Sequence, residues 1–189
     1  MSILIVGLIL FLGIHSIRIF APAVRDDLAA RLGAGPWRGL YSLVSAVGLV
    51  GIIWGFSLAR ADAGYLYSPP VWVRHLAALL MLFSFIAMAV YVFPAGRLKP
   101  MLKHPMLVSI KIWALAHLLA NGDAAGLVLF GAVLAWAVAD RISVKRRGAA
   151  VPAPGPVKWD GIAIATALVV YLLFIWRLHL WLIGVAPLG

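Results

Sequence analysis

Apolar residues run through this sequence in long blocks that are separated by short polar stretches. Each block is near the ~17–25 residues that a helix needs to cross a bilayer, or slightly shorter. The blocks cover residues 3–20, 40–59, 76–93, 106–120, 124–139 and 161–185. The pattern predicts an all-α fold, a polytopic membrane bundle of about six transmembrane helices.

The polar stretches between the blocks predict how the chain is divided. The most conspicuous one reads RRGAAVPAPGPVKW, residues 146–159, and its Pro, Ala and Gly favour extended or mobile backbone. We therefore expect a five-helix core over 1–143, a basic linker over 144–159 and an accessory C-terminal transmembrane helix over 160–189.

A second short connection, Asn121-Gly122-Asp123, joins the fourth and fifth blocks. We expect Gly122 to supply a positive φ and Asp123 to cap the helix that follows. The two flanking helices should then form an antiparallel hairpin.

Composition supports the membrane interpretation and narrows the chemistry. The chain is 65% hydrophobic with a mean hydropathy of +1.06, far above soluble domains. It contains no cysteine, which excludes disulfides, thiolate catalysis and iron–sulfur clusters. All six acidic residues are Asp and lie in connections or at predicted helix ends, so a carboxylate proton relay in mid-bilayer is not expected.

The formal charge of +10 is explained largely by basic loops that indicate how the chain is oriented in the membrane. Basic residues cluster after the first, third and fifth predicted helices, whereas the opposite side has only Arg60 and Arg74. Since basic loops stay in the cytoplasm, both termini should lie outside it. The charge is spread over three short loops, which argues against nucleic acid and favours anionic lipid headgroups as neighbours.

Two histidines, His15 and His117, lie well inside apolar blocks. One interpretation is that each is a neutral imidazole hydrogen-bonded to a neighbouring helix. The other is that the pair forms the axial ligands of a haem in an apolar pocket. Helical spacing would place Trp113 and Asn121 on the face of His117, and Arg18 beside His15, where it would meet a haem propionate.

For the remaining ionisable residues in or beside the apolar blocks, we expect contact with the headgroup region rather than a binding role. Arg177 and His179 should reach toward the outer headgroups, because they lie in the outer half of the last block. His75 and His104 stand at predicted helix starts, beside Arg74 and Lys103, where headgroup water can solvate them.

Three segments carry a resemblance to a known family. They read GIHSIRIF, KHPMLVSIKIWALAHLLANGD and LVLFGAVLAWAVADRISVKRR. Over roughly residues 1–147 the sequence resembles the NnrU family of bacterial membrane proteins, which is associated with nitrite and nitric oxide metabolism. The resemblance implies a location in the bacterial inner membrane, where the distribution of basic loops predicts both termini on the periplasmic side.

The same segments are similar to zeta-carotene isomerase, a haem b membrane enzyme that converts a central cis double bond of a carotenoid to trans. Its ligand histidines correspond to His15 and His117, so the resemblance implies haem b as cofactor and redox or isomerase chemistry on a hydrophobic small molecule. The isomerase has a cysteine where this chain has Ala114. In the isomerase that cysteine is described as a replacement iron ligand on redox change, so the sequence departs from the isomerase at the residue on which ligand exchange depends.

Two other functions stay open. The bundle could be a non-catalytic accessory protein for nitrite and nitric oxide reductases. Alternatively, the His104-Pro105 pair is similar to one that helps bind S-adenosylmethionine in membrane methyltransferases. Those enzymes also carry a Glu in their C-terminal motif, and this chain has none. The candidate cofactor-binding residues are His15, His117, Arg18, Trp113, Asn121 and His104.

Overall fold

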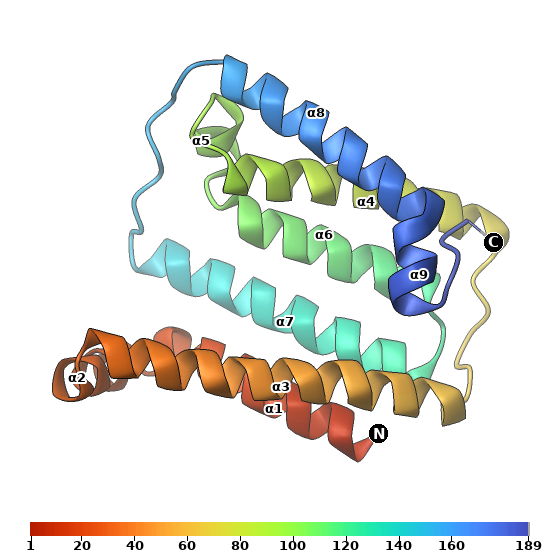
Figure 1. The fold of residues 1–189 in the computed structure, drawn as a ribbon, viewed down its shortest axis with the longest axis horizontal. Helices are drawn as coiled ribbons and strands as arrows, with labels where there is room; N and C mark the ends of the chain where they lie inside the picture. The colour runs from red at the N-terminus through yellow and green to blue at the C-terminus, as the bar shows by residue number, and fades with distance from the viewer. Residues whose placement is uncertain (189) are drawn as a thin grey trace. The chain divides into compact units, whose positions relative to one another are not determined.

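The computed structural model describes residues 1–188, and most of them are helical (Figure 1). The elements are α1 (Ser2–Phe20), α2 (Pro22–Leu32), α3 (Ala34–Asp62), α4 (Val71–Val92), α5 (Leu98–Leu102), α6 (Pro105–Ala120), α7 (Ala124–Arg146), α8 (Lys158–Leu173), the π-helix η1 (Phe174–Leu178) and α9 (His179–Ile183). They form two compact units. Unit 1 contains α1, α2, α3 and α7, and unit 2 contains α4, α5, α6, α8, η1 and α9.

The helices confirm the predicted class of fold. Among residues 1–188, five helices are long and apolar enough to cross a membrane, the last of them running from α8 through α9. Helix α6 is apolar but has 16 residues, or roughly 24 Å of rise, less than the ~30 Å hydrocarbon core. The described part of the chain is therefore that of a helical membrane protein, with five helices of spanning length and one shorter apolar helix.

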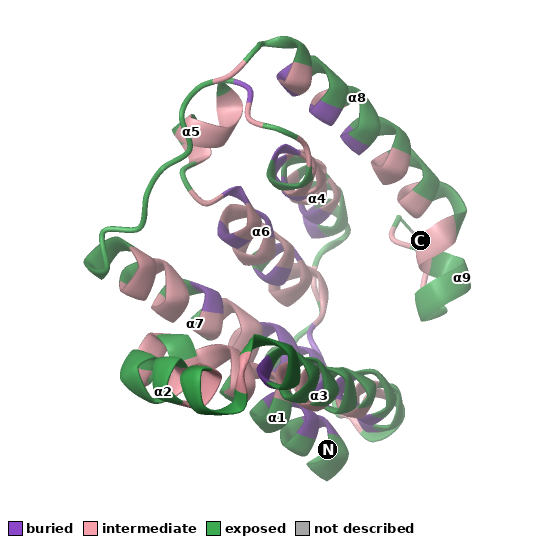
Figure 2. Cartoon of the chain, turned by 60° about the vertical axis from the view of Figure 1, so that its left-hand side comes forward, coloured by how far each residue is buried: buried purple, intermediate pink, exposed green. Residues whose placement is uncertain are grey.

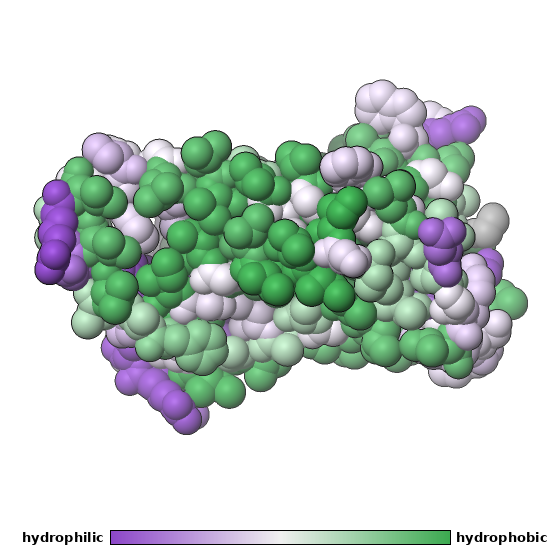
Figure 3. All heavy atoms as spheres, turned by 90° about the horizontal axis from the view of Figure 1, so that it is seen from below, coloured by the Kyte–Doolittle hydropathy of each residue, from purple (hydrophilic) through white to green (hydrophobic). Residues whose placement is uncertain are grey.

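The outer surface of α1 and α3 has the character of a lipid-facing surface. Side chains such as Leu43, Val50 and Ile53 on α3 are each more than half exposed. Figure 3 shows a continuous apolar face over these two helices, with hydrophilic side chains gathered toward the ends. Exposed apolar residues in this number are expected where lipid rather than water surrounds the helix.

Helices α1 and α3 of unit 1 pack antiparallel at very close range, because glycines line their contact. A Cβ added at Gly48 would lie 2.6 Å from the backbone nitrogen of Phe11, and one added at Gly7 would meet the backbone of α3. At Gly55 the added atom would collide with the backbone of Leu4. Small residues allow such backbone contact between membrane helices, where packing replaces the hydrophobic effect as the main attraction.

In unit 2, α4 packs against both α6 and α8. The Ser84 hydroxyl, which is buried, donates to the backbone carbonyl of Ser109 on α6 at 2.9 Å. On the other side, the Tyr171 hydroxyl of α8 donates to the carbonyl of Ala78 at 2.9 Å. The buried positions of α8 lie along one side of that helix (Figure 2).

A buried carboxylate fixes the start of α8 within unit 2. Asp160 is 8% exposed, and it accepts hydrogen bonds from the backbone N–H groups of Arg97 at 2.7 Å and Leu98 at 3.1 Å. Glycine is required at position 96, because a Cβ there would collide with the Asp160 carboxylate. The backbone N–H of Gly155, in the linker, donates to the Gly96 carbonyl. The last helix is thus attached to α4 and α5 by polar contacts as well as by apolar packing.

Replacing Asp160 with alanine is expected to destabilise unit 2. The change removes two hydrogen bonds to a charged group and leaves two N–H donors unsatisfied, a loss of about 2–3 kcal/mol. Thermal unfolding of the purified protein in detergent, followed by circular dichroism, would measure it. Asp62→Ala, at the exposed end of α3, is the matched control; equal unfolding temperatures for the two variants would contradict the prediction.

The structure departs from the predicted boundaries mainly at polar helical segments. Helix α2 lies in a stretch that was expected to be a connection, and its Arg31 pairs with Asp27 at 2.8 Å, four residues earlier. Helix α3 begins at Ala34 rather than at residue 40. Pro36 does not prevent this, because a first-turn proline lacks only an N–H that would have no helical partner.

The connection after α6 is built partly as predicted. The Asp123 carboxylate caps α7, accepting from the N–H of Gly126 at 2.7 Å. The expected positive φ at Gly122 is wrong. Glycine is needed there because a Cβ would collide with the carbonyl oxygen of Tyr67. The boundary between the units falls between Asn121 and Gly122, and the antiparallel hairpin stays a prediction.

Candidate functional site

His15 lies in unit 1 among aromatic rings. Its ring centroid is 4.4 Å from that of Phe11 on the same helix, 5.2 Å from Tyr41 of α3 and 6.0 Å from Trp136 of α7. The last two rings present their edges. Three helices therefore contribute to the surroundings of this imidazole, and two of the three rings come from distant parts of the sequence.

A hydrogen bond defines the tautomer of His15. Nδ1 lies 2.6 Å from the backbone carbonyl oxygen of Phe11. Because a carbonyl only accepts, Nδ1 must carry the hydrogen, and the lone pair of the neutral ring is then on Nε2. Metal-binding histidines commonly have this arrangement, in which the second nitrogen orients the ring and increases its basicity.

Trp136 contributes a buried polar atom close to His15. Among the described residues, its indole Nε1 is the one buried side-chain nitrogen or oxygen without a hydrogen-bond partner. A buried donor in this condition costs about 1–3 kcal/mol unless something accepts from it. Trp136 thus has a buried N–H without an acceptor on a ring that lies against His15.

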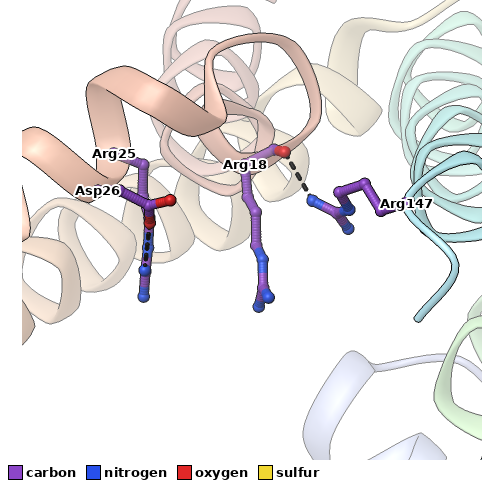
Figure 4. A network of polar contacts seen from close by, with 4 residues as sticks. All are labelled: Arg18, Arg25, Asp26 and Arg147. Carbon is purple, nitrogen blue, oxygen red and sulfur yellow. Dashed lines mark hydrogen bonds and ion pairs between the residues drawn. The ribbon is translucent and has the colours of Figure 1, made fainter. Parts of the chain in front are cut away.

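Arg18 lies one turn beyond His15, at the end of α1. Its backbone carbonyl accepts from Nη1 of Arg147 at 2.7 Å (Figure 4). Arg147 also lies 3.8 Å from the Asp140 carboxylate. Figure 4 shows the Arg18 side chain extending away from the helix, between Arg147 and the Arg25–Asp26 ion pair. This end of unit 1 is strongly basic and suits an anionic group.

In unit 2, the structure brings together the three residues that helical spacing placed on one face of α6. The Nδ1 atom of His117 lies 2.8 Å from the Trp113 carbonyl, and the two rings are 5.0 Å apart. The Asn121 amide donates to the His117 carbonyl at 2.8 Å. His117 therefore has the same tautomer as His15, with its lone pair on Nε2.

His104 is at the opposite end of α6 from this group. It is the N-cap residue of the helix, thirteen positions before His117, or roughly 20 Å along the axis. The structure therefore does not bring His104 together with the other candidates of unit 2. Its proposed place among the cofactor-binding residues has no geometric support within this unit.

The His179 ring lies beside the His117 ring, a contact that the sequence did not predict. The two imidazole centroids are 6.4 Å apart with an angle of 24° between the ring planes. Nδ1 of His179 lies 2.7 Å from the carbonyl oxygen of Val185. The expectation that His179 extends toward headgroups missed this contact, which depends on the chain reversing after α9. The only signal in the sequence was an ionisable residue inside an apolar block.

These residues fit a haem better than a metal ion held by protein alone. Among residues 1–188, no group of three or more His, Asp, Glu or Cys side chains could hold a metal ion. A haem iron needs only one or two protein ligands, because the porphyrin supplies the others. Each unit holds at least one imidazole that is oriented by a backbone carbonyl, which is the kind of ligand that haem iron takes.

The fold and these side chains define a multi-pass membrane protein with oriented imidazoles in its apolar helices. The chain belongs to the NnrU family, whose model, described as NnrU protein, matches residues 3–187. No curated protein and no solved structure matches it. The family match extends through the linker and the last helix, beyond the 1–147 over which the resemblance was visible.

Proposed function

We propose that this NnrU-family protein binds haem b within the membrane, with His15 and His117 as the candidate residues that would hold the iron. The observation that carries the proposal is their common arrangement. Each ring donates from Nδ1 to the carbonyl four residues earlier on its own helix, at 2.6 Å and 2.8 Å respectively. Each therefore has its lone pair on Nε2, the atom that binds iron.

Other candidate residues would assist in distinct ways. The Arg18 guanidinium is exposed at the end of α1 and suits a haem propionate, which prefers a charged donor near the membrane surface. The Trp113 ring packs on His117 and restricts its rotation. Asn121 binds the carbonyl of His117 and stabilises the last turn of α6. In unit 1, the rings of Tyr41 and Trp136 pack edge-on against His15 and would help to fix its orientation.

A haem held in this way would supply Lewis-acid or one-electron chemistry toward a small molecule that enters from the bilayer. Nitric oxide and conjugated polyenes are candidates, the first from the association of the family with nitrite and nitric oxide metabolism. The apolar helices favour such uncharged molecules over hydrophilic ones.

Absorption spectra test the proposal directly. The protein would be expressed with a haem supplement, purified in detergent and measured oxidised and dithionite-reduced. We expect a Soret band, with the sharp α and β bands of six-coordinate ferrous haem after reduction, and about one haem per chain by the pyridine haemochrome assay. A folded, helical protein without a Soret band would overturn the proposal.

We further propose an inner-membrane topology with both termini in the periplasm. The most basic connections follow α1, α4 and α7, and basic loops remain cytoplasmic. Alkaline phosphatase fused after residue 65 or after residue 188 should be active, because these positions are expected in the periplasm. Green fluorescent protein fused after residue 99 or after residue 147 should fluoresce, because these positions are expected in the cytoplasm. The reverse pattern would contradict the proposed orientation.

A further inference from the structure

The last helix and the C-terminal tail border an open groove within unit 2. Its volume is about 640 Å³, within the ~300–1,000 Å³ of sites that bind small molecules. Every residue that lines it is apolar, so the groove suits a hydrocarbon chain. The lining residues are Val169, Leu172, Leu173, Ile175, Trp176 and Leu188.

A reversal of the chain makes one wall of this groove. Gly184, with φ +77°, is the left-handed residue that ends α9, a position that favours glycine. The Val185 carbonyl then accepts from Nδ1 of His179 at 2.7 Å, which attaches the tail to the helix that it has just left. Figures 1 and 2 show the tail turned back beside α9 and the end of α8. Leu188 therefore lies across the groove from α8.

The groove has the depth of an acyl chain in one leaflet. From Val169 to Trp176 the helix rises by roughly 10 Å. The middle of the span Lys158–Ile183 falls between residues 170 and 171. The groove therefore extends from mid-bilayer toward the C-terminal end of the helix, over most of one ~15 Å half of the hydrocarbon core. Leu172 is 61% exposed and Trp176 is 70% exposed, so lipid can reach the groove.

Arg177 adds a positive charge at the end of the groove nearest the membrane surface. Its guanidinium carbon lies 5.9 Å from the ring centroid of Trp176, and both residues belong to the π-helical segment η1. Single π turns are found frequently at functional sites. The one acidic side chain of unit 2 is Asp160, seventeen positions earlier, or roughly 25 Å along the helix. Arg177 thus has no carboxylate partner within its unit, and a phosphate would match its planar guanidinium.

We infer that this groove is a binding site for one anionic phospholipid. One acyl chain lies between α8 and Leu188, and the phosphate accepts hydrogen bonds from Arg177. Arginine side chains near helix ends reach headgroups in this way, and exposed tryptophans such as Trp176 and Trp181 are typical of the same depth. A zwitterionic lipid would bring its own ammonium group close to the guanidinium. The site requires no haem, so it stands or fails independently of the proposed function.

Lipid binding to variants of Arg177 tests the headgroup contact. Delipidated protein in detergent would be titrated with phosphatidylglycerol or with phosphatidylcholine of the same acyl chains, and bound lipid counted by native mass spectrometry. We expect one phosphatidylglycerol to bind about fivefold more tightly than phosphatidylcholine. Arg177→Gln should abolish this preference. Arg60→Gln should keep it, because Arg60 also lies in the last turn of a spanning helix but belongs to unit 1.

Two outcomes of this titration would overturn the inference. The first is equal binding of the two lipids to the wild-type protein, and the second is an Arg177→Gln protein that retains the preference. Circular dichroism would show that the variants keep their helices, and Arg177 is exposed, so its replacement should not prevent folding.

Filling the groove tests the acyl-chain contact without changing the charge. Leu172→Trp should reduce binding of phosphatidylglycerol several-fold, because the indole occupies the space of the chain. Leu43→Trp is the matched control, since Leu43 is 62% exposed on the apolar face of α3 and does not line the groove. Phosphatidylglycerol with a diazirine in mid-chain should label Leu172, Leu173 or Leu188 several-fold more than Leu43. Equal labelling of α3 and α8 would indicate ordinary surrounding lipid and overturn the inference.

Discussion

His117→Ala is expected to remove most of the haem from the protein. His117 is a proposed iron ligand, and it lies in the apolar helix α6 with its tautomer determined by the hydrogen bond to the Trp113 carbonyl. Loss of a residue that merely orients a ligand already reduces affinity about 10–100-fold. Loss of the ligand itself should leave less than about a tenth of the wild-type haem content.

The haem-to-protein ratio after purification measures this effect, with circular dichroism confirming that the helices remain. His75→Ala and His104→Ala are suitable controls, the first exposed and the second at the far end of α6. Both should retain wild-type haem content. If His117→Ala retains as much haem as these controls, His117 is not a ligand.

Gly48→Ala should separate α1 from α3 and destabilise unit 1 strongly. The added methyl group would lie 2.6 Å from the Phe11 nitrogen and 2.9 Å from its Cα. Backbone atoms cannot rotate away as a side chain can, so the helices must move apart along their length. Overpacking typically costs 1–3 kcal/mol, and contact with backbone places this change at about 3 kcal/mol. We expect Gly48→Leu to prevent accumulation of folded protein.

The same two helices offer matched controls for this prediction. A Cβ at Gly13 of α1 or at Gly39 of α3 would have no other atom within 4 Å. Gly13→Ala and Gly39→Ala should therefore be neutral or slightly stabilising, because alanine favours a helix. Thermal unfolding in detergent compares all three alanine variants. A Gly48→Ala protein as stable as Gly39→Ala would show that the close contact is absent in the membrane.

The class of fold could be predicted from sequence because apolar blocks of spanning length have few alternatives. Polar helical segments could not be predicted, because a hydropathy profile does not distinguish them from connections. Helix α2 was missed for that reason, although its Asp27 and Arg31 have the spacing of a helical ion pair. The family membership was visible in three short segments, and the match over residues 3–187 shows that the last helix belongs to the family as well.

In the candidate site, contacts between residues close in the sequence could be predicted, whereas contacts between distant residues could not. The group of Trp113, His117 and Asn121 was predictable, because residues four apart share a helix face. The contact with His179 depends on a π-helical turn and on a chain reversal at Gly184. Neither has a reliable sequence signature, so an imidazole sixty-two positions away could not be assigned to His117. Trp136 was hidden for the same reason, since it reaches His15 only through helix packing.

The two units are interleaved along the chain, because the boundaries fall after residues 67, 121 and 147. During translation, α1 and α3 leave the ribosome first, but α7, which completes their unit, is made only after α4 and α6. Unit 1 must therefore remain incomplete, in the translocon or in the lipid, while α4 and α6 of unit 2 are inserted. A truncation before residue 147 would leave both halves incomplete, so neither is a natural fragment for separate expression.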